Sequence, residues 1–195
     1  MGWVVGLDLG RTTDATAVLA AEQVYPDASG QPHYHVPLIE RWVGVSYAEQ
    51  ERRVVALLRR PELRPAPLVI DIVGCGRGEF DRYVERGLQP TGVFAHAGHQ
   101  VTREGAIWRV PKRDLIHAAV RVLQERRLHI APALPEAATL VKELADYRVT
   151  IDAQTAHDSY AAWRTGSHDD TVFALALCLW GAESGALAPA HVWVL

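Results

Sequence analysis

The chain has 195 residues, of which 49% are hydrophobic and 22% charged, and its formal net charge is −3. This size and composition fit one globular domain, expected over residues 1–195, with a core large enough to close. No apolar run has membrane-spanning length, no signal-peptide pattern is evident, and the two cysteines, Cys75 and Cys178, are too far apart for a zinc motif.

The first part of the chain is predicted to be an antiparallel meander of three strands. Apolar runs at residues 3–9 and 15–21 predict two strands, and residues 35–43 predict a third. Between the second and third strands, residues 26–32 contain the Pro, Asp, Ser and Gly that favour a turn.

The middle of the chain alternates helices and strands. Residues 47–60 have one apolar face and predict a helix that stops at Pro61. Residues 68–73 are apolar on both faces except at Asp71, which predicts a central, parallel strand. A glycine-rich turn then leads into a helix expected at residues 79–86.

The remaining elements follow a similar order. We expect a strand at 90–95, a polar loop or ribbon at 96–109, helices at 112–127 and 135–147, a hairpin with arms at 148–151 and 160–163, and a last helix at 166–180.

Two adjacent carboxylates, Asp169 and Asp170, stand at the head of the last helix. From Val172 to Trp180 this helix is apolar on every face, so most of its surface must be buried. Aspartate favours the helix N-cap and gains from the helix dipole, which is one explanation of the pair. A cap requires only one aspartate, however.

Asp8 and Asp71 each interrupt an otherwise apolar strand shortly before a glycine-containing turn. An ionised carboxylate in a core must be paired, protonated or bound to a metal. If the two strands are neighbours and the last helix packs across them, both carboxylates meet Asp169 and Asp170. Crowded carboxylates raise one another's pKa, and divalent cations remove that conflict. Oxygen ligands favour Mg²⁺ or Mn²⁺, and a pair of such ions is the usual device for hydrolysis at phosphorus.

Over residues 3–180 the sequence resembles the C-terminal nuclease domain of phage large terminases. The His168-Asp169-Asp170 element followed by Ala174-Leu175-Ala176 is the most specific part. The other matching stretches are residues 6–11 with Asp14, residues 69–76, residues 111–116, and Glu143-Leu144. The resemblance implies an α/β, ribonuclease-H-like fold, in which an antiparallel meander and then parallel strands form a mixed sheet flanked by helices. It also implies cutting of concatemeric viral DNA during genome packaging by a two-metal mechanism.

Residue roles follow from the same resemblance. It implies that Asp8, Asp71, Asp169 and Asp170 are catalytic and hold two Mg²⁺ or Mn²⁺ ions, with Asp170 favoured as the ligand of the adjacent pair. His168 is a candidate for orienting the carboxylates or assisting proton transfer. We expect DNA phosphates to be contacted by the hairpin at 154–158 and by four basic residues, which are Arg11, Arg77, Arg103 and Lys112.

The expected partners are double-stranded DNA, a terminase ATPase domain and a portal protein. The sequence has no Gly-x-x-x-x-Gly-Lys-[Ser/Thr] loop, so no ATPase domain is expected within it. We expect no membrane association and a cytoplasmic location, which is the host cytoplasm if the chain is viral.

Three alternatives stay open. Another ribonuclease-H-like nuclease, such as a Holliday-junction resolvase or a transposase, would use the same carboxylates. Residues 6–13 also resemble the phosphate-binding hairpin of actin-like ATPases, of which this chain would be a fragment. An inactive structural module would cut no nucleic acid.

Overall fold

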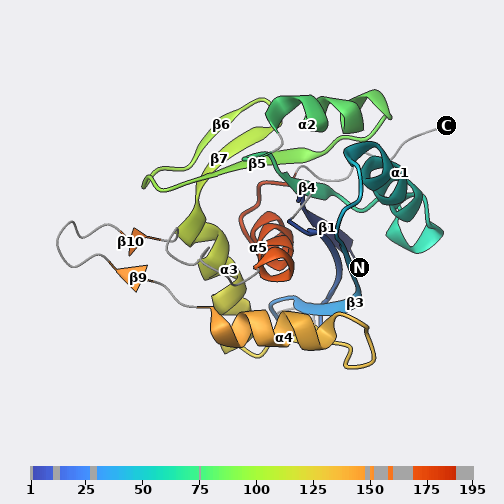
Figure 1. Ribbon diagram of the computed structural model, residues 1–195. Helices are drawn as coiled ribbons and strands as arrows, with labels where there is room; N and C mark the ends of the chain where they lie inside the picture. The colour runs from blue at the N-terminus through green and yellow to red at the C-terminus, as the bar shows by residue number, and fades with distance from the viewer. Residues whose placement is uncertain are drawn as a thin grey trace.

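A computed structural model describes residues 2–10, 14–26, 30–74, 76–147, 150–151, 158–159 and 169–187. Its centre is an eight-stranded mixed sheet in the order β6-β7-β5-β4-β1-β2-β3-β8 (Figure 1). Five α-helices of the described chain flank this sheet. The predicted fold class, a mixed sheet between helices, is confirmed.

The first half of the sheet is the predicted antiparallel meander. It consists of β1 (Gly2–Asp8), β2 (Thr16–Val24) and β3 (His33–Trp42), each antiparallel to the next. β1 lies at the centre of the sheet because its other edge pairs with a parallel strand.

The second half of the sheet is largely parallel. β4 (Leu68–Asp71) pairs with β1, β5 (Thr91–His96) pairs with β4, and β7 (Ile107–Pro111) pairs with β5, all in parallel. The apolar run around Asp71 is therefore a central parallel strand, as predicted, although it ends at Asp71. In the β1–β4 register Leu7 faces Ile70. Asp8 and Asp71 thus occupy equivalent positions at the carboxyl ends of neighbouring strands.

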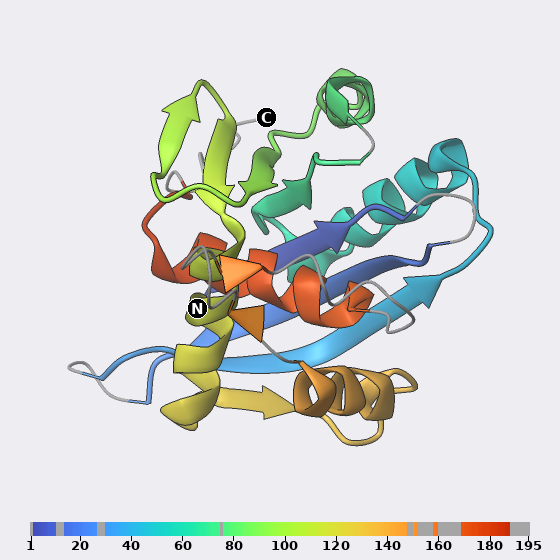
Figure 2. The same cartoon turned by 60° about the vertical axis from the view of Figure 1, so that its left-hand side comes forward.

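The helices form a layer on each face of the sheet (Figures 1 and 2). On one face, α1 (Tyr47–Leu58) and α2 (Gly76–Glu85) close a core cluster with Leu7 and Ile70. On the other face lie α3 (Lys112–Gln124), α4 (Ala137–Asp146) and α5 (Asp170–Glu183). α5 contacts β1, β2 and β4, and it is buried on all sides from Asp170 to Gly181, as its uniform apolarity predicts.

The close approach of α5 to β1 depends on Gly6. A Cβ atom at this position would lie 2.0 Å from the carbonyl oxygen of Ala174 and 2.8 Å from the amide nitrogen of Cys178. Only glycine lets the two backbones come this near. The thiol of Cys178 is sealed in the same interface, where it donates to the carbonyl oxygen of Val4 at 3.3 Å. Burial raises the pKa of this thiol to about 12.

The polar segment 96–109 forms a ribbon, one of the two forms expected for it, because it contains β6 (Thr102–Glu104) and most of β7, which are antiparallel to each other. Other element predictions were wrong in detail. β8 (Leu128–Ile130) was not predicted. α2 begins three residues earlier than predicted, at Gly76, and α3 ends at Gln124 rather than at residue 127. The short antiparallel pair of β9 (Thr150–Ile151) and β10 (Asp158–Ser159) lies in the predicted hairpin region. Residues 154–157, 160–163 and 166–168 of the predicted hairpin and helix start lie outside the described residues.

Among the helices of the described chain, none has the length and apolar character that crossing a membrane requires.

Candidate active site

Asp8 and Asp71 end two adjacent parallel strands, which places both carboxylates at one edge of the sheet. The backbone just after Asp8 is fixed by buried polar side chains. The Gly10 amide donates to the hydroxyl of Thr16 at 2.9 Å, and the side-chain amide of Gln50 donates to the carbonyl oxygens of Gly10 and Val45 at 3.3 and 2.7 Å. These contacts hold the strand end firmly. The carboxylate of Asp71 accepts a hydrogen bond of 3.0 Å from the amide of Val73.

Asp169 and Asp170 bring the start of α5 to the same edge. Asp169 is the N-cap residue of α5, and Asp170 is its first helical residue. The side chain of Asp169 makes no capping hydrogen bond. Instead, Glu143 of α4 accepts hydrogen bonds from the first turn of α5, at Thr171 and Val172. The Asp169 side chain therefore does not cap α5, and capping does not explain the pair of aspartates.

Each of these two aspartates faces a cation from another element. The ammonium of Lys112, the first residue of α3, lies 3.4 Å from Asp169 Oδ2 and 5.1 Å from the centre of the Phe173 ring. Arg41 on β3 donates to Asp170 Oδ2 from Nη2 at 2.9 Å and from Nε at 3.2 Å. All four side chains in these pairs are at least three-quarters buried, so the ion pairs are less screened by water than pairs at the surface.

Asp8 interacts electrostatically with the other three aspartates. Burial raises the pKa of Asp8 well above its ordinary value, and the negative charges of Asp71, Asp170 and Asp169 raise it further. The positive charge of Lys112 acts in the opposite direction. Burial also raises the pKa of Glu143, with a smaller contribution from Asp170. The edge of the sheet thus gathers four carboxylates beside the two cations Lys112 and Arg41.

The chemistry of this set of side chains fits a hard divalent cation. All four groups offer carboxylate oxygens, which suit Mg²⁺ or Mn²⁺, and a bound cation would lower the cost of ionising Asp8. In the part of the chain that the structure describes, no three His, Cys, Asp or Glu side chains are already gathered closely enough to hold one ion. Lys112 and Arg41 hold Asp169 and Asp170 instead.

Of the other predicted site residues, Arg77 and Arg103 lie on described elements and two lie outside the described chain. Arg77 is the exposed second residue of α2, in the segment that follows β4. Arg103 lies on β6, stacks over Trp108 and donates to the carbonyl oxygen of Gly105. Four strand spacings separate β6 from β1 and three separate it from β4, so the strand of Arg103 lies about 19 Å from that of Asp8 and about 14 Å from that of Asp71. Arg11 and His168 lie outside the described residues.

Sequence reasoning did not identify Arg41 or the role of Glu143. Arg41 gives no signal in sequence, because it is one of several charged residues at the end of a half-buried strand. Glu143 was part of the family resemblance but had no role assigned to it. Its position on the buried face of α4, beside Leu140, was the signal that could have found it.

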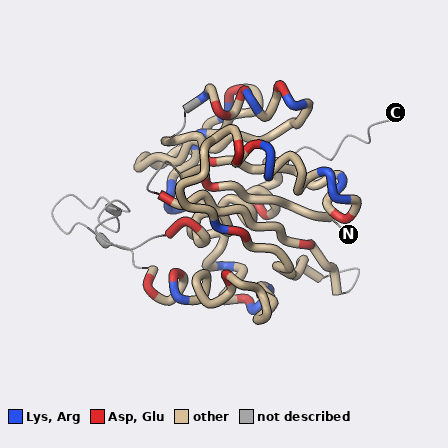
Figure 3. The backbone as a smooth tube through the Cα atoms, turned by 45° about the vertical axis from the view of Figure 1, so that its right-hand side comes forward, with Lys and Arg blue, Asp and Glu red and all other residues tan. Residues whose placement is uncertain are grey.

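The arginines of α1 and α2 form mixed-charge surfaces rather than a uniform basic face (Figure 3). Arg52 and Arg53 pair with Glu49 on the same helix. Arg82 of α2 and Arg86, just after that helix, pair with the buried Glu51 of α1. The pairs with Glu49 are typical of a solvated helix face, whereas those with Glu51 join α1 to the end of α2.

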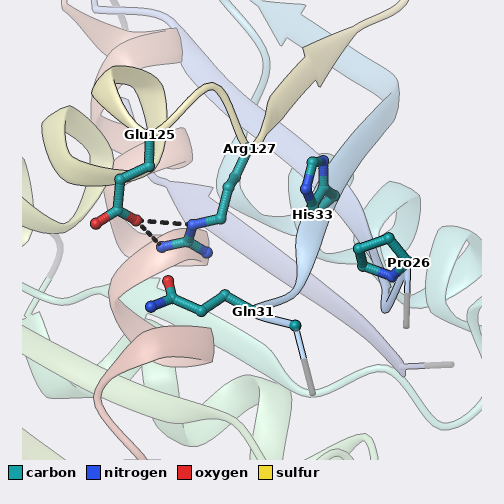
Figure 4. A pocket seen from close by; sticks show the side chains of 6 residues that line it. Pro26, Gln31, His33, Glu125 and Arg127 are labelled. Carbon is teal, nitrogen blue, oxygen red and sulfur yellow. Dashed lines mark hydrogen bonds and ion pairs between the residues drawn. The ribbon is translucent and has the colours of Figure 1, made fainter. Parts of the chain in front are cut away.

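Two hollows in the described surface are lined by residues other than the four aspartates. One of about 470 Å³ is lined by Glu51, Arg82, Glu85 and Arg86. The other, of about 330 Å³, is lined by Pro26, Gly30, Gln31, His33, Glu125 and Arg127 (Figure 4). The guanidinium of Arg127 is directed at Glu125, Glu183 and the carbonyl oxygen of Pro32. Its donors are therefore engaged within the protein.

Comparison with solved structures identifies the fold. The large terminase nuclease of the thermophilic phage G20c matches with a TM-score of 0.62 and 18% identity over 93% of this chain and 82% of that chain. The chain has the fold of the large terminase nucleases. The nuclease domain of the bacteriophage SPP1 large terminase, whose structure has bound Mn, matches with a TM-score of 0.54 and 13% identity over 91% of this chain and 85% of that one.

A full terminase contains the same terminase-nuclease fold as one part. The bacteriophage HK97 large terminase matches with a TM-score of 0.61 and 14% identity over 91% of this chain, which spans 39% of that protein. No protein-family model matches the sequence, and no curated protein does. The terminase-nuclease fold expected from the sequence resemblance, a mixed sheet flanked by helices, is confirmed by the three terminase structures.

Proposed function

We propose that this chain is a Mg²⁺- or Mn²⁺-dependent endodeoxyribonuclease that acts as the nuclease of a phage large terminase and cuts concatemeric DNA during packaging. One observation carries the proposal. Asp8, Asp71, Asp169 and Asp170 come from two neighbouring strands and one helix start, and three of them raise the pKa of the fourth. The terminase-nuclease fold and the Mn bound to the SPP1 domain support the same conclusion.

The aspartates would hold two divalent cations and fix their positions relative to the scissile phosphate. When bound, such cations lower the pKa of an attacking water and offset the charge that builds on the leaving oxygen. Asp8 and Asp71 are suited to a fixed role because they end strands whose backbones are hydrogen-bonded on both sides. Asp170 would need to turn from Arg41 in order to take part.

The basic residues near the aspartates would hold the DNA backbone. Lys112 is the nearest, since it already lies beside Asp169, and its ammonium can contact a phosphate oxygen bound there. Arg77 would contact the DNA strand at a phosphate further from the scissile bond. Arg103, on the distant edge strand β6, would contact a phosphate further still along the duplex. Arg11 and the hairpin at 154–158 complete the proposed DNA contacts. If several of these residues contact phosphates, DNA affinity falls steeply with salt.

The proposed partners are a terminase ATPase domain and a portal protein, and the proposed site of action is the cytoplasm of a host cell. The HK97 protein, of which this chain spans 39%, is a large terminase. DNA translocation would be the work of the ATPase.

The test is cleavage of linear duplex DNA by the purified chain with Mn²⁺, with Mg²⁺ and with a chelator. We expect cutting of linear duplex that requires the metal and is lost in Asp8→Asn and Asp71→Asn, with both variants folded by circular dichroism. A four-way junction and an RNA–DNA hybrid serve as competing substrates. Strict preference for the junction would assign a resolvase instead, and no cutting of any substrate would leave the structural-module alternative.

A further inference from the structure

Glu143 makes three hydrogen bonds to the first turn of α5 through one carboxylate oxygen. Oε2 accepts from the Thr171 amide at 3.0 Å, from the Thr171 hydroxyl at 2.6 Å and from the Val172 amide at 3.2 Å. Glu143 is 6% exposed and Thr171 is fully buried. The contact is thus shielded from water and joins two helices through residues that are 28 positions apart in sequence.

These donors are the ones that a local N-cap side chain usually takes. The first turn of a helix leaves backbone amides without partners in the helix, and the N-cap side chain accepts from the second or third helical residue. In α5 those residues are Thr171 and Val172, and the N-cap residue is Asp169. In α1, by contrast, the N-cap residue Ser46 accepts locally from the amide of Glu49. In α5 the capping acceptor comes from α4 instead.

Two consequences follow for the aspartates. The carboxylate of Asp169 is released from capping and points to Lys112 at 3.4 Å. The helix start is also fixed in direction, because Glu143 ties it to α4 while the Phe173 amide donates to the Asp169 carbonyl oxygen at 2.8 Å. The start of α5 is therefore tied to α4 by Glu143, in addition to the first backbone hydrogen bond of α5 itself.

We propose that Glu143 is a positioning residue for the candidate active site: by capping α5 from α4, it relieves Asp169 of a capping role and sets where Asp169 and Asp170 stand relative to Asp8. This inference rests on the proposed nuclease function. Glu143 itself touches neither substrate nor the aspartate carboxylates in this role; it acts through the backbone of α5.

The test compares Glu143→Ala, which removes the acceptor, with Glu143→Gln, which keeps an oxygen at the same reach. In Glu143→Ala we expect the Thr171 and Val172 amides to exchange hydrogen at least about tenfold faster, while Leu177 and Leu179 keep their protection. We also expect Mn²⁺ affinity, measured by calorimetry, to fall by about 10-fold to 100-fold. In cleavage, kcat should fall while KM for DNA stays near that of the wild type. Glu143→Gln should recover most of each property.

Asp146→Asn is the matched control, because it neutralises an exposed carboxylate on the same helix, where Asp146 forms an ion pair with the exposed Lys142 at 2.8 Å. It should leave exchange, affinity and cleavage unchanged. Thr171→Val, which removes only the hydroxyl donor, provides a second test if Glu143→Ala fails to fold, and its effects should be in the same direction and smaller.

Three outcomes overturn the inference. Unchanged exchange at Thr171 and Val172 in the Ala variant would show that Glu143 does not fix the helix start. Faster exchange with unchanged Mn²⁺ affinity and kcat would reduce Glu143 to a stabilising cap, while the nuclease function stands. Absence of Mn²⁺ binding and DNA cutting in the wild type would reject the proposed function itself, and the positioning role with it.

Discussion

Gly6→Ala would place a methyl group between β1 and α5. The new Cβ atom would lie 2.0 Å from the carbonyl oxygen of Ala174 and 2.8 Å from the amide nitrogen of Cys178. Both atoms belong to the helix backbone, so no side-chain rotation can relieve the contact. α5 must move away from the sheet by about 1 Å or more to restore ordinary van der Waals separation.

The loss of stability in Gly6→Ala depends on how much packing around α5 the movement disrupts. α5 is buried from Asp170 to Gly181, so a shift loosens packing along the whole helix. Overpacking a core usually costs about 1–3 kcal/mol, and a clash with rigid backbone belongs at the upper end, near 3 kcal/mol. For a chain of 195 residues, a loss of this size lowers Tm by about 6–12 °C.

The assay is thermal and urea denaturation of Gly6→Ala beside Gly78→Ala. Gly78 lies in α2, and a Cβ atom added there would meet no other atom within 4 Å, so alanine should stabilise the helix by about 0.5–1 kcal/mol. The same chemical change should thus have opposite signs at the two sites. If Gly6→Ala stays within about 0.5 kcal/mol of the wild type, the close approach of β1 and α5 is wrong.

Three further predictions concern charge. Asp8→Asn should raise stability at neutral pH in metal-free buffer. The pKa of Asp8 in the folded protein lies above the ordinary value of 3.8. The native state therefore loses stability as pH rises above 3.8, because the Asp8 carboxyl ionises less readily in the folded protein than in the unfolded chain. The gap between variant and wild type, from urea midpoints, should therefore close as pH falls to 3.8 and below, and a gap that widens on acidification would contradict the raised pKa. Arg127→Gln should lower the free energy of unfolding by about 3–5 kcal/mol because it breaks a buried ion pair with Glu183. Arg121→Gln removes a half-exposed partner of the same carboxylate and should lower it by less than about 1 kcal/mol. Equal urea midpoints for the two variants would refute this difference. Arg41→Gln should tighten Mn²⁺ binding by roughly tenfold in calorimetry, since it removes the ion pair with Asp170 and a nearby positive charge. Weaker binding would mean that Arg41 holds Asp170 in its ligating position.

The elements that the sequence predicted well are those whose pattern has one physical explanation. The unbroken apolar run before Asp71 fits only a strand covered on both faces, and the uniformly apolar stretch from Val172 fits only a buried helix. The strands that were missed, or expected only as part of a loop or ribbon, lack such a pattern. β8 is three residues long with no fully buried side chain, and it exists because it pairs with β3. In β7, Arg109 covers Phe94 with its guanidinium, so a polar residue protects an apolar one.

The candidate site was predictable only in part for a related reason. The cost of an aspartate within an apolar strand is visible in sequence, which pointed to Asp8 and Asp71. Which cation faces each carboxylate depends on tertiary packing. Arg41 reaches Asp170 across 129 residues of chain, and Glu143 reaches Thr171 across 28. No local pattern encodes either distance.

The enclosure of Cys178 gives this protein a built-in reporter. A thiol with a pKa of about 12, sealed between β1 and α5, reacts with an alkylating reagent only when the helix lifts from the sheet. In a Cys75→Ser background it would be the sole thiol of the chain. Its labelling rate would then measure how often the β1–α5 interface opens. A cation that links the start of α5 to Asp8 would slow the labelling, so cation binding could be followed without DNA cleavage.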